Sequence, residues 1–153
     1  MGTKATQRPD GKPPASAGGR RKTPAPPRKA VILIADDTTD ARELYADYFS
    51  SRDFTVLTAR DGAEATRVAL EHLPDIIVMD LAMPQWDGVT AIQRIKADPR
   101  GSRTRVILLT GYPHKTVERA ALLAGADYFL TKPCLPAVLE THVRQLQQQR
   151  PSP

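Results

Sequence analysis

The stretch Ile76-Ile77-Val78-Met79-Asp80 decides the fold class of this 153-residue chain. It is a short apolar run that ends in a carboxylate, and an earlier run, residues 31–35, likewise ends in the acid pair Asp36-Asp37. Such runs are typical of buried parallel strands. The carboxyl ends of parallel strands meet at one edge of the sheet, where open α/β sheets bind their ligands. We therefore expect the three acids to lie together at that edge.

Three carboxylates gathered in this way favour a bound cation, because each negative charge raises the pKa of its neighbours. Carboxylate oxygens are ligands of hard divalent cations, and Mg²⁺ is the expected ion. Asp36 and Asp37 have an alternative role as an N-cap pair for the next helix. Their position directly after a buried strand favours the metal site.

The chain from residue 31 onward alternates between strand-like and helix-like segments. The strand-like runs fall at residues 31–35, 54–58, 75–79, 105–109 and 126–130. Helical periodicity lies between and after them, at residues 40–51, 62–72, 88–97, 114–124 and 136–149. This alternation predicts the α/β class: a doubly wound (βα)5, flavodoxin-like parallel sheet of order 2-1-3-4-5, with helices on both faces.

Local signals predict where some helices begin and end. Asp40 followed by Glu43 predicts a capping box at the start of the first helix. Pro113 lies near the first position of the fourth helix, and Gly125 stands where its C-terminal cap belongs.

Composition excludes several classes of protein. A single cysteine, Cys134, rules out an internal disulfide framework. The sequence has no apolar run near the roughly 18 residues that a membrane helix needs, and its first thirty residues contain no apolar signal-peptide core. We expect a soluble, cytoplasmic protein with no membrane partner. Cys134 is interpreted as a small buried hydrophobe in preference to a redox sensor.

The basic charge of the chain lies in its N-terminal segment. The net charge is +5, yet residues 1–29 carry eight Lys or Arg and one acid, so the remainder is mildly acidic. Residues 1–29 also hold six prolines and four glycines, which predicts a disordered basic tail. Residues 30–147 then form one folded domain, followed by a short tail at 148–153. A nucleic-acid-binding regulator acting through the basic tail is an alternative function.

Two further strand ends add chemistry to the acidic edge. Thr110 follows the fourth strand and Lys132 the fifth. A carboxylate can accept a phosphoryl group as a mixed anhydride, and a metal ion, a lysine and a hydroxyl can hold the phosphoryl oxygens. A nucleotide site is disfavoured, because the sequence contains no Gly-rich phosphate loop.

At these positions the sequence resembles the receiver domain of response regulators from bacterial two-component systems. The matching segments are Asp36-Asp37, Asp80–Gly88, Thr110-Gly111, Gly125–Asp127 and Lys132-Pro133. The resemblance covers residues 31–147, and we place the receiver domain at 30–147. It implies a phosphorelay protein that is no conventional enzyme and catalyses only its own phosphorylation and dephosphorylation.

The resemblance implies a role for each matching residue. Asp80 would accept a phosphoryl group from a histidine kinase or a histidine phosphotransfer protein. Asp37, Asp80 and the backbone carbonyl of Ala82 would bind Mg²⁺, with Asp36 acting largely through water. Lys132 would pair with Asp80 and then with the phosphoryl oxygens.

The same resemblance implies a switch. Thr110 would turn its hydroxyl inward once the phosphate is present, and Phe129 would move from surface to interior. The alternative for Phe129 is an ordinary core aromatic. The peptide bond before Pro133 would be cis.

The position of the chain end after the fifth helix leads us to expect a stand-alone receiver. Its output would be a protein-binding surface around the fourth helix, fifth strand and fifth helix, which meets a downstream protein target or a second copy in a phosphorylation-dependent dimer. A further alternative is an aspartyl-nucleophile phosphohydrolase. Those enzymes usually carry a second Asp two positions after the nucleophile, where this chain has Ala82.

Overall fold

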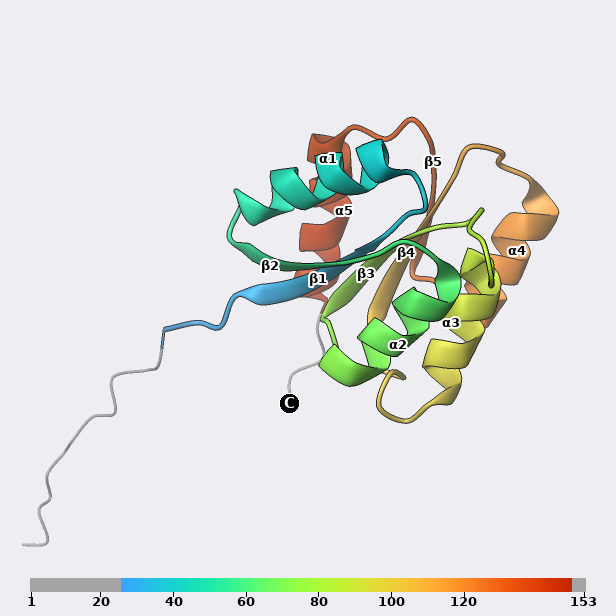
Figure 1. The fold of residues 1–153 in the computed structure, drawn as a ribbon, viewed down its shortest axis with the longest axis horizontal. Helices are drawn as coiled ribbons and strands as arrows, with labels where there is room; N and C mark the ends of the chain where they lie inside the picture. The colour runs from blue at the N-terminus through green and yellow to red at the C-terminus, as the bar shows by residue number, and fades with distance from the viewer. Residues whose placement is uncertain (1–25, 150–153) are drawn as a thin grey trace, which may run out of the picture.

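The computed structural model describes residues 26–149, which form a five-stranded parallel sheet with one helix after each strand (Figure 1). The strand order is β2-β1-β3-β4-β5, which confirms the predicted doubly wound fold. The strands are β1 (Ala30–Ala35), β2 (Phe54–Ala59), β3 (Ile76–Asp80), β4 (Arg105–Thr110) and β5 (Tyr128–Thr131). The helices are α1 (Thr39–Ser50), α2 (Gly62–His72), α3 (Gly88–Ala97), α4 (Lys115–Ala124) and α5 (Pro136–Gln148).

The helices cover both faces of the sheet. In Figure 1, α1 and α5 lie on one face, whereas α2, α3 and α4 lie on the other. Side chains of β1 alternate between the two cores: Ile32 and Ile34 pack in the α1–α5 core, and Leu33 and Ala35 pack in the opposite one. Because the central strands β1, β3 and β4 are buried on both faces, they carry apolar residues at almost every position. This explains the uninterrupted apolar runs in the sequence.

The predicted capping box at Asp40 is wrong. The helix α1 begins at Thr39, its N-cap is Thr38, and the Thr38 side chain makes no capping hydrogen bond. The carboxylate of Asp36 instead accepts a hydrogen bond from the backbone N–H of Thr38. The hydrogen-bond acceptor for the N–H of the N-cap residue is therefore Asp36, the residue directly after β1, and not a glutamate within the helix.

The connection from α4 to β5 differs by a few residues from the prediction. His114 is the N-cap of α4, so Pro113 lies just outside the helix. Gly125 is the C-cap with a φ of 116°, as predicted. The N–H of Ala126 still bonds to the carbonyl of Ala121. This helix-closing turn delays β5 until Tyr128, two residues later than expected.

Most of the predicted N-terminal tail, residues 1–25, lies outside the described residues, as do residues 150–153 of the predicted C-terminal tail. The four described tail residues, 26–29, are exposed. Among residues 26–149, no helix combines the length and the apolar character needed to cross a membrane.

Candidate functional site

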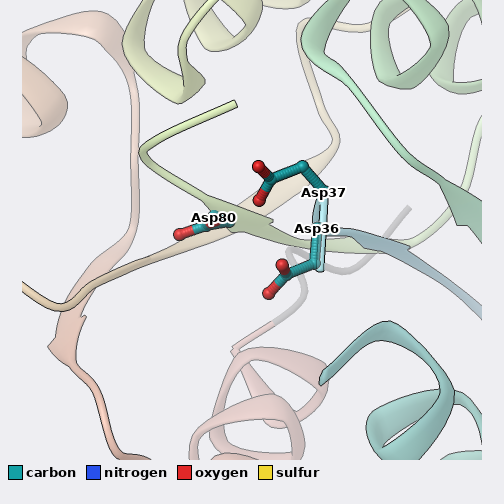
Figure 2. Close-up of side chains that lie close together, drawn as sticks. All are labelled: Asp36, Asp37 and Asp80. Atoms are coloured by element: carbon teal, nitrogen blue, oxygen red, sulfur yellow. The ribbon is translucent and has the colours of Figure 1, made fainter. Parts of the chain in front are cut away.

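Three carboxylates lie together at the carboxyl edge of the sheet. Asp36 and Asp37 follow β1, and Asp80 is the last residue of β3, the strand paired with β1. Each offers a carboxylate oxygen, and these oxygens lie within 4.8 Å of one another. Figure 2 shows the three side chains turned to the same side of the two strand ends. Asp36 and Asp80 are buried and Asp37 is exposed, so the cluster faces solvent on the side of Asp37.

Lys132 brings a positive charge between two of these carboxylates. Its Nζ donates a hydrogen bond of 2.8 Å to Oδ2 of Asp36 and lies 3.3 Å from Oδ1 of Asp80. Burial works to lower the pKa of Lys132, but the hydrogen bond and charge of Asp36 outweigh it and raise that pKa. Lys132 therefore stays charged. Lys132 thus lies beside Asp80, the partner that the resemblance implies, and is still closer to Asp36.

The second oxygen of Asp36 is also engaged. Oδ1 of Asp36 accepts the backbone N–H of Thr38 at 2.9 Å. Its backbone carbonyl accepts the guanidinium of Arg42 at 2.8 Å. Asp36 is thus held by hydrogen bonds from Lys132, Thr38 and Arg42. The residue as a whole is only 2% exposed. A carboxylate held in this way orients its neighbours more than it offers a free ligand atom.

Asp80 has an unusually high pKa for an aspartate. Burial is the largest cause, the charge of Asp36 adds to it, and Lys132 partly offsets both, which leaves the pKa of Asp80 raised from 3.8 to about 6. A nearby divalent cation would favour the ionised form and lower this pKa. The site therefore has the electrostatic character of a cation site, with oxygen ligands suited to Mg²⁺.

The loop after Asp80 is closed by a glycine that no larger residue could replace without movement. The N–H of Gly88 donates to the carbonyl of Leu81, and the N-cap Asp87 accepts the N–H of Thr90. A Cβ at Gly88 would lie 2.7 Å from the carbonyl oxygen of Asp80. The Asp-Gly pair thus lets α3 start directly beside the end of β3. Ala82 lies in this loop and is exposed.

The two remaining strand ends carry the predicted switch residues. Thr110 is 2% exposed, and its Oγ1 accepts the backbone N–H of Tyr112 at 3.0 Å. Thr110 pairs in register with Thr131, which directly precedes Lys132. Phe129 is half-buried and packs against the core formed with α2, α3 and α4. The Lys132–Pro133 peptide bond is cis.

Two contacts near the site involve residues whose part the sequence did not indicate. Tyr45 of α1 donates its hydroxyl to the backbone carbonyl of Cys134 at 2.7 Å. The sequence signal that could have indicated this contact is a tyrosine at a core-facing position of a helix, because the hydroxyl of a buried tyrosine needs a hydrogen-bond partner. The guanidinium carbon of Arg94 lies over the ring of Trp86, 4.0 Å from the ring centroid. Burial raises the pKa of the Cys134 thiol, which disfavours the reactive thiolate.

Fold and site together define a class of protein: a flavodoxin-like sheet with an acidic cluster and a lysine at its carboxyl edge. The chain belongs to the response regulator receiver domain family, whose sequence model matches residues 32–144. Members of this family are signalling modules of two-component systems and not conventional enzymes.

Similar proteins include an uncharacterised 14.6 kDa protein from the sodA1 3′ region of Leptolyngbya boryana, 35% identical over 74% of this chain and 87% of that protein. The response regulator PleD of Caulobacter vibrioides is 36% identical over 76% of this chain, which spans 26% of PleD. Among solved structures, the response regulator domain of Thermotoga maritima CheB is 31% identical. It has a TM-score of 0.72, with 81% of this chain and 100% of that chain covered.

Proposed function

We propose that this chain accepts a phosphoryl group on Asp80 from a phosphohistidine donor, in a Mg²⁺-dependent reaction. The observation that carries the proposal is the position of Asp80: a buried strand-end carboxylate, 3.3 Å from the ammonium of Lys132 and beside two further carboxylates. In the transfer, an oxygen of Asp80 forms the new O–P bond while the P–N bond of the donor breaks. The donor ring, which carries a proton on its other nitrogen, keeps the electron pair of the P–N bond and leaves as neutral imidazole, and the product is an aspartyl phosphate.

The residues of the site divide the remaining work. Mg²⁺ would be held by Asp37, Asp80 and the backbone carbonyl of Ala82, and would neutralise charge on the phosphoryl oxygens. Asp36, whose two oxygens already accept hydrogen bonds from Lys132 and Thr38, would contribute to the binding of the ion through water. The ammonium of Lys132 lies 3.3 Å from Oδ1 of Asp80, close enough to contact a phosphoryl group attached to that carboxylate. It would stabilise the negative charge on the phosphoryl oxygens during the transfer.

The output of the reaction is a change of surface. Thr110 moves its hydroxyl toward the phosphoryl group, which breaks the hydrogen bond from the N–H of Tyr112. Phe129 then fills the space that Thr110 leaves. The affected face includes α4, where Leu122 and Leu123 are exposed by 47% and 81%. This face is the docking surface for a downstream protein or for a second phosphorylated copy. The donor is a histidine kinase or a histidine phosphotransfer protein of the cytoplasm.

The phosphohydrolase alternative is not supported by the site. Ala82, two positions after Asp80, has no ionisable side chain, so it cannot serve as the general acid that a leaving alcohol needs. The alternative of nucleic-acid binding through residues 1–29 falls mainly outside the described residues.

Intact-mass spectrometry after incubation with acetyl phosphate tests the proposal. Wild type should gain one phosphoryl group with Mg²⁺ and none with EDTA, and Asp80→Asn should gain none. The matched control is Asp47→Asn, because Asp47 is an exposed carboxylate on α1; it should be labelled like wild type. Full labelling of Asp80→Asn would refute the assignment of Asp80.

A further inference from the structure

Two tyrosines of α1 reach across to the segment that follows β5. The hydroxyl of Tyr45 donates to the backbone carbonyl of Cys134 at 2.7 Å. The hydroxyl of Tyr48 donates to Oε1 of Glu140, on α5, at 2.6 Å. Both bonds join the same two parts of the fold, but only the first one ends on the loop that carries Lys132.

Tyr45 is built into the core. It is 5% exposed and packs in the α1–α5 core together with Phe49 and Leu139. Burial raises the pKa of its phenol, so the hydroxyl keeps its proton and remains a hydrogen-bond donor. A phenylalanine ring would fill the same space without the oxygen, so the hydroxyl contributes chiefly its hydrogen bond to the carbonyl of Cys134.

The bond from Tyr45 completes the anchoring of a three-residue segment, residues 132–134. At its start, the backbone N–H of Lys132 donates to the carbonyl of Thr110 at 2.7 Å. At its end, the carbonyl of Cys134 accepts Tyr45. The first backbone bonds of α5 go to the carbonyl of Leu135, one residue later, so they do not hold Cys134.

The same bond ties the lysine to the carboxylates. The helix α1 starts directly after Asp36 and Asp37, and Tyr45 lies on its second turn. Tyr45 therefore links the element that follows the acid pair to the loop that carries Lys132. The ammonium of Lys132 must reach Asp36 at 2.8 Å and Asp80 at 3.3 Å at the same time. Small shifts of such groups weaken their effect on a reaction strongly.

We propose that Tyr45 is a positioning residue for phosphoryl transfer: its hydroxyl holds the backbone at Cys134 so that the ammonium of Lys132 stays between Asp36 and Asp80. The inference rests on the proposed function, because it assigns a residue to the same reaction. The hydroxyl of Tyr45 donates its hydrogen bond to the loop of Lys132 and not to one of the three carboxylates, so the proposed effect runs through that loop.

The test compares Tyr45→Phe with Tyr48→Phe in the full chain. Each variant keeps its ring and loses one hydroxyl between the same two parts of the fold. We measure three quantities: the rate of labelling by acetyl phosphate with Mg²⁺, the hydrogen exchange of the Lys132 amide by NMR, and the midpoint of urea unfolding. Loss of one hydrogen bond predicts that Tyr45→Phe labels about 2- to 10-fold more slowly, with a faster-exchanging Lys132 amide. Tyr48→Phe should match wild type in labelling rate and in exchange of the Lys132 amide, even if its urea midpoint falls as much as that of Tyr45→Phe.

The possible results separate a failure of the proposed function from a failure of the inference about Tyr45. Wild type that takes no label refutes the proposed function and the inference together. A labelled wild type with Tyr45→Phe labelled at the same rate overturns the inference alone. Equal slowing in Tyr45→Phe and Tyr48→Phe shows a general loss of stability and also overturns it. Slower labelling of Tyr45→Phe with unchanged exchange at Lys132 overturns the route through the loop backbone.

Discussion

Replacing Asp80 with asparagine should stabilise the protein in the absence of Mg²⁺, although it removes the contact with Lys132. The pKa of Asp80 is raised from 3.8 to about 6, chiefly by burial and then by Asp36. A carboxyl group with a raised pKa binds its proton more tightly in the folded state. Above pH 6 Asp80 is ionised in the folded protein, and this lowers the free energy of unfolding. Below pH 3.8 the carboxyl group is protonated in the folded and unfolded states, so the free energy of unfolding is not lowered.

The size of the effect follows from the two pKa values. At about 1.4 kcal/mol per pKa unit, ionised Asp80 lowers the free energy of unfolding by about 3 kcal/mol at pH 7.5 and by about 1 kcal/mol at pH 4.5. Asparagine has the shape of the protonated carboxyl group and does not ionise. Asp80→Asn should therefore gain about 3 kcal/mol over wild type at pH 7.5, and this gain should shrink by about 2 kcal/mol at pH 4.5.

Urea unfolding in EDTA, followed by circular dichroism at both pH values, measures this difference. The control is Asp47→Asn, because Asp47 is exposed and its replacement should change the free energy of unfolding by less than about 0.5 kcal/mol. Added Mg²⁺ should stabilise wild type at pH 7.5 and narrow its gap to Asp80→Asn. Equal stabilities of wild type and Asp80→Asn at pH 7.5, or a gap that does not depend on pH, would refute the reasoning.

Three further predictions follow from the site. Gly88→Ala should lower the free energy of unfolding by about 1–3 kcal/mol, because the new Cβ would lie 2.7 Å from the carbonyl oxygen of Asp80. The control Gly111→Ala, whose Cβ would meet nothing within 4 Å, should be as stable as wild type in urea unfolding. Equal losses of stability in the two variants would contradict this. Lys132→Met should slow labelling by acetyl phosphate at least tenfold by mass spectrometry, because a charged donor to the phosphoryl oxygens is lost; an unchanged rate would remove Lys132 from the reaction. Asp37→Asn should weaken Mg²⁺ binding at least tenfold in a fluorescence titration, and unchanged affinity would exclude Asp37 as a ligand.

The fold was predictable because the central strands β1, β3 and β4 are buried on both faces. Runs such as residues 76–79 are apolar at each position, and helical periodicity fills the intervals between them. Right-handed crossovers between parallel strands then leave few possible topologies. The acidic cluster followed from the same logic, since Asp36 comes directly after β1 and Asp80 ends β3, the strand paired with it.

Element ends were less predictable, because they depend on which group satisfies the free backbone atoms of a helix. Asp40 and Glu43 matched a capping box, but the carboxylate of Asp36 already accepts the N–H of Thr38. The acceptor for the N-cap N–H therefore comes from a residue before the helix, and a pattern within the helix does not reveal it.

The sequence by itself determined the parallel sheet, the edge at which the acids gather, and the presence of a lysine and a threonine at the same edge. Those features depend on periodicity and on the ends of strands, which are local properties of the chain. Only the tertiary structure decided which carboxylate Lys132 contacts most closely and that Tyr45 holds the carbonyl of Cys134. These contacts join residues 96 and 89 positions apart. Their lengths depend on how α1 and the β5–α5 loop pack together, which no local pattern encodes.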